Sequence, residues 1–137
     1  MELHHQCYVS DEPSGRLVIL HGLFGSARNW RALARQLSDD YEVLVVDMPN
    51  HGSSPWLDRG DYGTLADAIA VFMDTHGLAG ATVLGHSMGG KTAMVLSISR
   101  PDLVAGLIVA DIAPVPYKFG NEMYIDAMEA VDLGRLK

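Results

Sequence analysis

The stretch Ala81-Thr-Val-Leu-Gly-His-Ser-Met-Gly-Gly-Lys-Thr-Ala-Met94 runs from an apolar, strand-like segment through a turn into an apolar, helix-like one. Residues 85–89 at its centre match the pattern Gly-x-Ser-x-Gly around Ser87. In this setting the pattern is typical of a nucleophile elbow, where a sharp turn exposes a serine hydroxyl at the end of a strand. The flanking glycines leave room for the turn, and a helix N-terminus favours developing negative charge. We therefore expect Ser87 to be a nucleophile; the alternative is a glycine-rich turn without chemistry.

Strand-like and helix-like segments alternate on both sides of this turn. The strands are short apolar runs, and the helices carry apolar residues at helical spacing. This alternation predicts the α/β class: a mostly parallel sheet with helices on both faces and ligands at the carboxyl ends of the strands. The expected strands are Arg16–His21, Tyr41–Met48, Ala81–Gly85 and Leu103–Ile112, with Leu3–Ser10 as an edge strand; the expected helices are Asn29–Ser38, Thr64–Thr75 capped by Thr64, Met88–Arg100 and Asn121–Val131, and Pro49–Gly63 is expected to be a loop.

A second glycine-containing turn follows the strand Arg16–His21. The segment His21-Gly22-Leu23-Phe24-Gly25 stands where a hydrolase of this class places one of its two oxyanion donors. Acyl transfer puts negative charge on a carbonyl oxygen, and two backbone N–H groups can stabilise it. We expect the N–H groups of Leu23 and Met88 to be these donors. The alternative is that His-Gly merely ends a strand.

Composition narrows the class of protein further. The chain has 137 residues, 48% of them hydrophobic, which suits one globular domain. Its net charge of −7 argues against binding to nucleic acid or to an anionic membrane surface. The single cysteine, Cys7, excludes an internal disulfide and a cysteine-based zinc cluster. With no signal-peptide pattern and no apolar run of membrane-spanning length, the expected location is the cytoplasm.

Four blocks of sequence, taken in order, resemble the α/β-hydrolase superfamily, and within it the YbfF-like esterases and the mitochondrial abhydrolase-domain proteins. The resemblance implies a serine esterase or thioesterase that acts on acyl esters, acyl-CoA among them, by a Ser-His-Asp mechanism and without a metal or organic cofactor. The more specific blocks are the extension of the elbow and the block that begins at Asp111. The four are His21-Gly-Leu-Phe-Gly-Ser26, Asp47-Met-Pro-Asn-His-Gly-Ser-Ser54, Gly85-His-Ser-Met-Gly-Gly-Lys-Thr-Ala-Met94 and Asp111-Ile-Ala-Pro-Val115.

The acid of the triad is expected to be Asp111. In this fold the chain order is serine, acid, histidine, and Asp111 ends the strand that follows Ser87. The resemblance supports this choice, because the family associates an aspartate in the Asp-Ile-Ala-Pro block with the triad. The alternative is a structural carboxylate that accepts hydrogen bonds from loop N–H groups.

No histidine follows Ser87, so the expected triad does not close within these residues. His86 precedes the serine and is expected to point away from it, and His21 is expected to hold the oxyanion loop. His51 lies in a loop after a strand and is the weak candidate for a substitute base. We therefore expect little esterase turnover from the 137 residues alone.

These expectations define the domain and its partners. Residues 1–137 are interpreted as the amino-terminal part of an α/β-hydrolase domain, with 116–137 beginning a helical cap. The expected partner is a small-molecule acyl ester or thioester, with a homo-oligomer or a carboxyl-terminal part of the domain as protein partner. The alternatives are other chemistry of the same fold (carbon–carbon hydrolysis, a lyase step or perhydrolysis) and a non-catalytic binding or assembly fragment.

Overall fold

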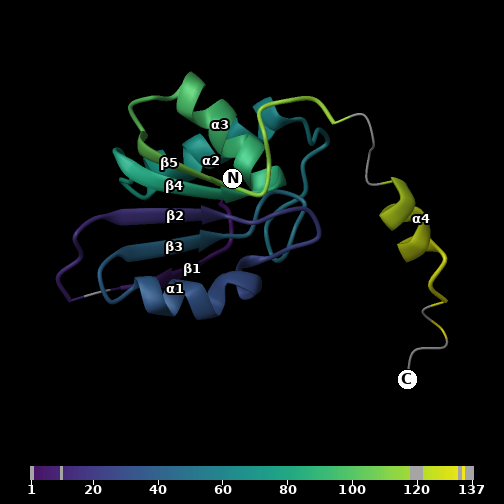
Figure 1. Ribbon diagram of the computed structural model, residues 1–137, viewed down its shortest axis with the longest axis horizontal. Coiled ribbons are helices and arrows are strands. Elements are labelled where there is room, and N and C mark those ends of the chain that lie inside the picture. The colour runs from purple at the N-terminus through teal and green to yellow at the C-terminus, as the bar shows by residue number, and fades with distance from the viewer. Residues whose placement is uncertain (1, 10, 118–121, 133, 135–137) are drawn as a thin grey trace.

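A computed structural model describes residues 2–9, 11–117, 122–132 and 134 of the protein. Its centre is a five-stranded sheet in the order β1-β3-β2-β4-β5 (Figure 1). Strands β2 to β5 run parallel, while the short β1 pairs antiparallel to β3 at one edge. The sheet confirms the expected α/β class. Its strands are β1 (His5–Tyr8), β2 (Arg16–Leu20), β3 (Glu42–Val46), β4 (Ala81–His86) and β5 (Val104–Ala110).

Helices cover both faces of the sheet, as expected for parallel strands. One apolar core lies between the sheet and α1, and a second lies between the sheet and the pair α2 and α3. None of the helices in the described ranges has the length and apolar character needed to cross a membrane. The helices are η1 (Ala27–Trp30, a 3-10 turn), α1 (Arg31–Leu37), α2 (Tyr62–Thr75), α3 (Met88–Ser99) and α4 (Glu122–Glu129).

Alternating side chains of β2 serve the two cores. Val18 and Leu20 belong to the core under α2 and α3, whereas Leu17 and Ile19 belong to the core under α1. All four are buried, because the strand has a helix layer on each side. Full burial of such a side chain stabilises the fold by about 1.5–3 kcal/mol. The uninterrupted apolar run of this strand is thus a consequence of the two-sided cover.

Helix α2 begins two residues earlier than the sequence predicts, and its cap is Asp61 rather than Thr64. The Asp61 carboxylate accepts the Thr64 N–H and the Thr64 hydroxyl, both at 3.0 Å. These hydrogen bonds, the N–H first among them, hold the pKa of Asp61 below its ordinary value. The expected cap was wrong because a carboxylate three residues upstream satisfies the helix N–H groups and leaves Thr64 inside the helix.

Strand β5 is the edge of the sheet opposite β1. Within the described residues it pairs only with β4, and its central side chains Leu107 and Ile108 are 40% and 48% exposed. The strands inside the sheet are buried far more completely. The end of β5 leads directly to Asp111, so the candidate acid lies at the less covered side of the molecule.

Candidate active site

Ser87 occupies a sharp turn between β4 and α3. Its backbone has φ 52° and ψ −115°, a conformation that residues other than glycine seldom adopt. The Ser87 N–H donates to the Ala110 carbonyl at 3.1 Å, and the Ser87 carbonyl accepts the Lys91 N–H at 3.1 Å. The turn is therefore fixed from both sides, by the neighbouring strand and by the helix it begins.

Glycines make this turn sterically accessible. A Cβ atom on Gly89 would lie 2.6 Å from the His21 carbonyl oxygen and would overlap the Leu20 carbonyl. A Cβ atom on Gly85 would overlap the Gly89 carbonyl and lie 2.6 Å from the Gly90 Cα. Backbone therefore approaches backbone here without intervening side chains, which draws the start of α3 onto the ends of β2 and β4.

The loop after β2 is held by His21. The Met48 N–H donates to His21 Nε2 at 2.9 Å, so the ring proton lies on Nδ1, which donates to the Gly22 carbonyl at 2.7 Å. Burial lowers the pKa of His21. The Gly25 N–H closes the turn on the Gly22 carbonyl at 3.0 Å. These contacts agree with the expected loop-holding role of His21.

The loop and the Ser87 turn lie against each other. A Cβ atom on Gly22 would be 3.3 Å from the Ser87 Cβ. Leu23 follows Gly22 directly, and Met88 is the first residue of α3, whose N–H has no partner within the helix. The two expected oxyanion donors thus lie on adjoining segments.

Asp111 directly follows the last residue of β5, beside the same turn. The register pairs His86 with Ala110, which brings the residues that follow them, Ser87 and Asp111, to neighbouring strand ends. Asp111 has φ 57°, and its side chain is 89% exposed. Its Oδ2 atom lies 3.7 Å from His86 Nε2, a contact that sequence reasoning missed.

The remaining histidines are engaged elsewhere. The Nδ1 atom of His51 lies 3.0 Å from the Pro49 carbonyl, and its ring lies 5.2 Å from that of His21. The Nδ1 atom of His76 lies 2.8 Å from the Phe72 carbonyl at the end of α2. Among the hydrogen bonds of the described residues, none joins a histidine ring to the Ser87 hydroxyl. Nothing in this part of the chain supports His51 as a base.

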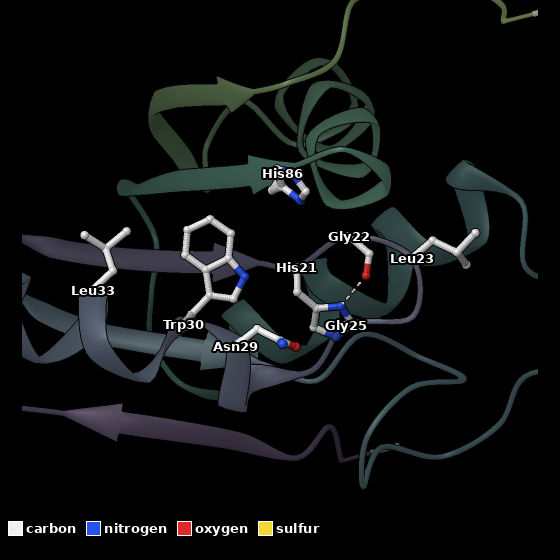
Figure 2. A pocket seen from close by; sticks show the side chains of 8 residues that line it. All are labelled: His21, Gly22, Leu23, Gly25, Asn29, Trp30, Leu33 and His86. Atoms are coloured by element: carbon white, nitrogen blue, oxygen red, sulfur yellow. Dashed lines mark hydrogen bonds between the residues drawn. The ribbon is translucent and has the colours of Figure 1, made fainter. Parts of the chain in front are cut away.

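A pocket of about 490 Å³ opens beside the His21–Gly25 loop (Figure 2). Trp30 and His86 pack edge to face with ring centroids 6.1 Å apart. Apolar side chains from the loop after β2, from η1 and from α1 contribute much of the lining. Such a lining suits an apolar part of a ligand. The lining residues are His21, Gly22, Leu23, Gly25, Asn29, Trp30, Leu33 and His86.

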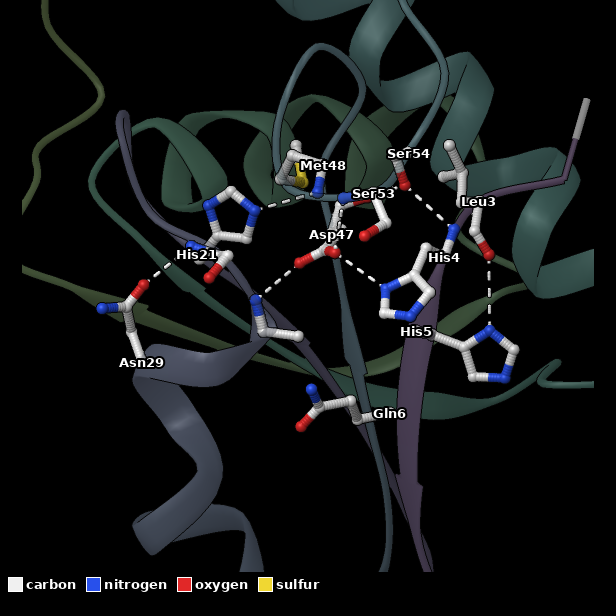
Figure 3. A network of polar contacts seen from close by, with 12 residues as sticks. Leu3, His4, His5, Gln6, His21, Asn29, Asp47, Met48, Ser53 and Ser54 are labelled. Carbon is white, nitrogen blue, oxygen red and sulfur yellow. Dashed lines mark hydrogen bonds and ion pairs between the residues drawn. The ribbon is translucent and has the colours of Figure 1, made fainter. Parts of the chain in front are cut away.

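A buried carboxylate organises the loops behind the site (Figure 3). Asp47, only 3% exposed, accepts the N–H groups of Ala27 at 2.6 Å and Ser53 at 3.0 Å, and its Oδ2 lies 2.7 Å from His4 Nδ1. Burial alone would raise the pKa of Asp47, but these donors together hold it below its ordinary value. From the sequence, Asp47 is named only as part of a block that resembles the family, and no role is predicted for it. The sequence signal for its role is a carboxylate at the end of a buried strand, followed by Ser53 and Ser54.

No metal centre emerges from these contacts. In residues 2–9, 11–117, 122–132 and 134, no group of three or more His, Cys, Asp or Glu side chains could hold an ion. The pairs His4–Asp47 and His86–Asp111 each supply only two groups. The expectation of a site without a metal or cofactor stays a prediction.

Residues 15–132 match the family model described as the alpha/beta hydrolase fold, and the chain belongs to this family. Within this family its sequence is similar to that of esterase YbfF. It is 43% identical over 101 residues to esterase YbfF of Escherichia coli. The aligned region covers 74% of this chain and 40% of the relative. It is also 41% identical over 121 residues to the sn-1-specific diacylglycerol lipase ABHD11 of Mus musculus. That aligned region covers 85% of this chain and 39% of the relative.

Comparison with a solved structure leads to the same family. The chain superposes on a marine microorganism esterase with a TM-score of 0.90 and 39% sequence identity, over 96% of this chain and 52% of that one. The chain therefore spans about two fifths of these curated relatives and about half of the solved esterase. These three similar proteins are described as two esterases and a lipase.

Proposed function

We propose that the protein acts as a serine hydrolase that cleaves acyl esters or thioesters by a Ser-His-Asp mechanism. The observation that carries the proposal is the strained Ser87 turn, packed against the His21–Gly25 loop at the carboxyl ends of the strands. Strain of this kind persists only where the surrounding fold enforces it, and it is concentrated at functional sites. The names of the relatives, esterase and diacylglycerol lipase, favour an acyl ester.

In this mechanism the Ser87 hydroxyl attacks the acyl carbonyl while a base removes its proton. The carbonyl oxygen becomes negative, and the N–H groups of Leu23 and Met88 stabilise it, assisted by the N-terminus of α3. The base returns the proton to the leaving alcohol or thiol, and water then hydrolyses the acyl-enzyme. Asp111 orients the imidazole base, for which its exposed carboxylate is accessible.

The base is the part of the mechanism that the described residues do not supply. We place it in sequence that would follow residue 137, because this fold orders its triad as serine, acid, histidine. The coverage of the relatives is consistent with this, since the chain matches only 39% and 40% of their lengths. Residues 116–137 would then begin the cap that selects the acyl group.

The test is covalent labelling of the full gene product with a fluorophosphonate probe. Ser87→Ala is expected to abolish both labelling and hydrolysis of a short p-nitrophenyl ester. Ser97→Ala is the matched control, because Ser97 lies on the same helix and its hydroxyl donates to the Met94 carbonyl. A Ser87→Ala protein that labels and hydrolyses like the wild type would contradict the proposal.

A further inference from the structure

One cation connects the helix that begins at the Ser87 turn to the segment that follows Asp111. The Lys91 ammonium on α3 donates to the Val115 carbonyl at 2.6 Å. It lies 4.7 Å from the ring centroid of Tyr117 and 5.8 Å from that of Tyr62. A charged donor and an aromatic face both strengthen such a contact beyond that of a neutral hydrogen bond. Lys91 therefore joins the first turn of α3 to residues 115–117.

The helix that carries Lys91 does not stabilise its positive charge. It lies in the first turns of α3, where the helix dipole disfavours a cation. No carboxylate in the described part of the chain forms an ion pair with it. The partners of the ammonium are instead a carbonyl and aromatic rings, so its contacts are with the segment after β5.

Two further contacts carry this connection back to Asp111. The Ala113 N–H donates to the Tyr117 hydroxyl at 3.0 Å, which folds the segment onto itself. Ile112 fills the space beside Gly90, where a Cβ atom would lie 2.6 Å from its Cγ2. Asp111 directly precedes these anchored residues and holds a positive φ of 57°. Since the Asp111 side chain is exposed, its placement depends on the backbone that follows it.

We propose, resting on the function proposed above, that Lys91 is a positioning residue for that reaction. Its ammonium holds residues 112–117 against α3 and thereby fixes the backbone of Asp111 beside the Ser87 turn. Lys91 itself touches no reacting atom. Its effect on turnover passes entirely through the acid.

The first arm of the test needs no activity. In Lys91→Met, amide hydrogen exchange at Ala113 is expected to accelerate about tenfold, because the segment opens more often, while amides of β2 and β4 stay protected. Arg35→Met is the matched control, since it removes the same charge from α1 on the opposite face of the sheet. Unchanged exchange at Ala113 in Lys91→Met would overturn the proposal.

The second arm is a double-mutant cycle on ester hydrolysis by the full gene product. Lys91→Met is expected to lower kcat about tenfold with KM little changed, and Lys91→Arg to recover most of the loss, since arginine also donates and stacks on aromatic rings. In an Asp111→Asn background, Lys91→Met should have no further effect. Independent, multiplying losses would overturn the proposal, because Lys91 would then act by another route.

The two arms separate this inference from the proposed function. If Ser87→Ala retained full hydrolysis, the proposed reaction would fail while the exchange result still stood. If Ser87→Ala were inactive but Lys91→Met left Ala113 exchange unchanged, the positioning role alone would fail.

Discussion

The two ends of the candidate site are built differently. The Ser87 turn is enclosed: backbone contacts from β2, β5 and α3 surround it, and glycines allow those contacts to be close. Asp111 lies at the end of an edge strand, 89% exposed, with a 3.7 Å contact to His86. The Ser87 turn is thus fixed by contacts within these residues, whereas Asp111 still presents a largely exposed carboxylate.

The largest expected effect is on catalysis at the exposed end. Asp111→Asn in the full gene product should lower kcat for ester hydrolysis by about 10³–10⁴-fold, because the amide cannot hold the imidazole in the required tautomer. Circular dichroism should show an unchanged fold, since the side chain is exposed. Asp102→Asn, an exposed carboxylate that pairs with Arg100, is the control. Near-normal turnover in Asp111→Asn would move the acid to another position.

The second largest effect should be a difference in stability between substitutions at the Ser87 turn and substitutions on β5. Gly89→Ala forces a Cβ into backbone carbonyls and should lower the free energy of unfolding by about 3 kcal/mol. Gly106→Ala on β5 should cost less than about 1 kcal/mol, because alanine suits a strand better than glycine and offsets part of the crowding. There the new Cβ would meet the Thr82 side chain at 2.9 Å rather than backbone. Urea denaturation measures both; equal losses would contradict the contrast.

The uncovered edge should also promote association. Leu107 and Ile108 expose apolar surface on a strand without charge or proline, the kind of edge that pairs with another chain. We expect the 137-residue chain to self-associate, and Ile108→Lys to shift it toward monomer in light scattering. Ile98→Lys, at an 82% exposed position on α3, is the control. A compact monomer at high concentration, unresponsive to an added carboxyl-terminal fragment, would refute the prediction.

The smallest effect concerns pH and the enclosed end. The pKa of His21 is lowered chiefly by burial, so the unfolded chain takes up a proton more readily than the folded one. The His21 contribution to stability is therefore full above about pH 6.5, the unfolded value, and declines as the pH falls toward the folded value. His21→Gln should flatten the dependence of unfolding free energy on pH between about 5 and 7. An unchanged slope in His21→Gln would contradict this prediction.

Local patterns were readable from the sequence. The Ser87 turn follows from glycine spacing between an apolar strand and an apolar helix, and the alternation of elements gave the sheet class. The cap of α2 was misplaced by three residues, since Asp61 and Thr64 are both good cap residues and only geometry decides between them.

Contacts between distant segments were not readable. The His86–Asp111 pair depends on the β4–β5 register, and the Lys91–Val115 bond depends on the path of the chain after β5. The hydrogen-bond partners of Asp47 come from three separate segments, at His4, Ala27 and Ser53. Such pairings require the tertiary fold, because no periodicity in the sequence records them.

The Asp47 network also bears on the order of folding. Its carboxylate accepts N–H groups from η1 and from the loop after β3, and it also contacts His4, 43 residues away along the chain. Closing so long a loop is entropically costly before other contacts reward it. The pairs β2–β3 and β4–β5, with register partners such as Arg16–Glu42 and Thr82–Gly106, close shorter loops and should therefore form before β1 docks on β3. Mutations in β1 would then mainly accelerate unfolding and leave the rate of folding almost unchanged.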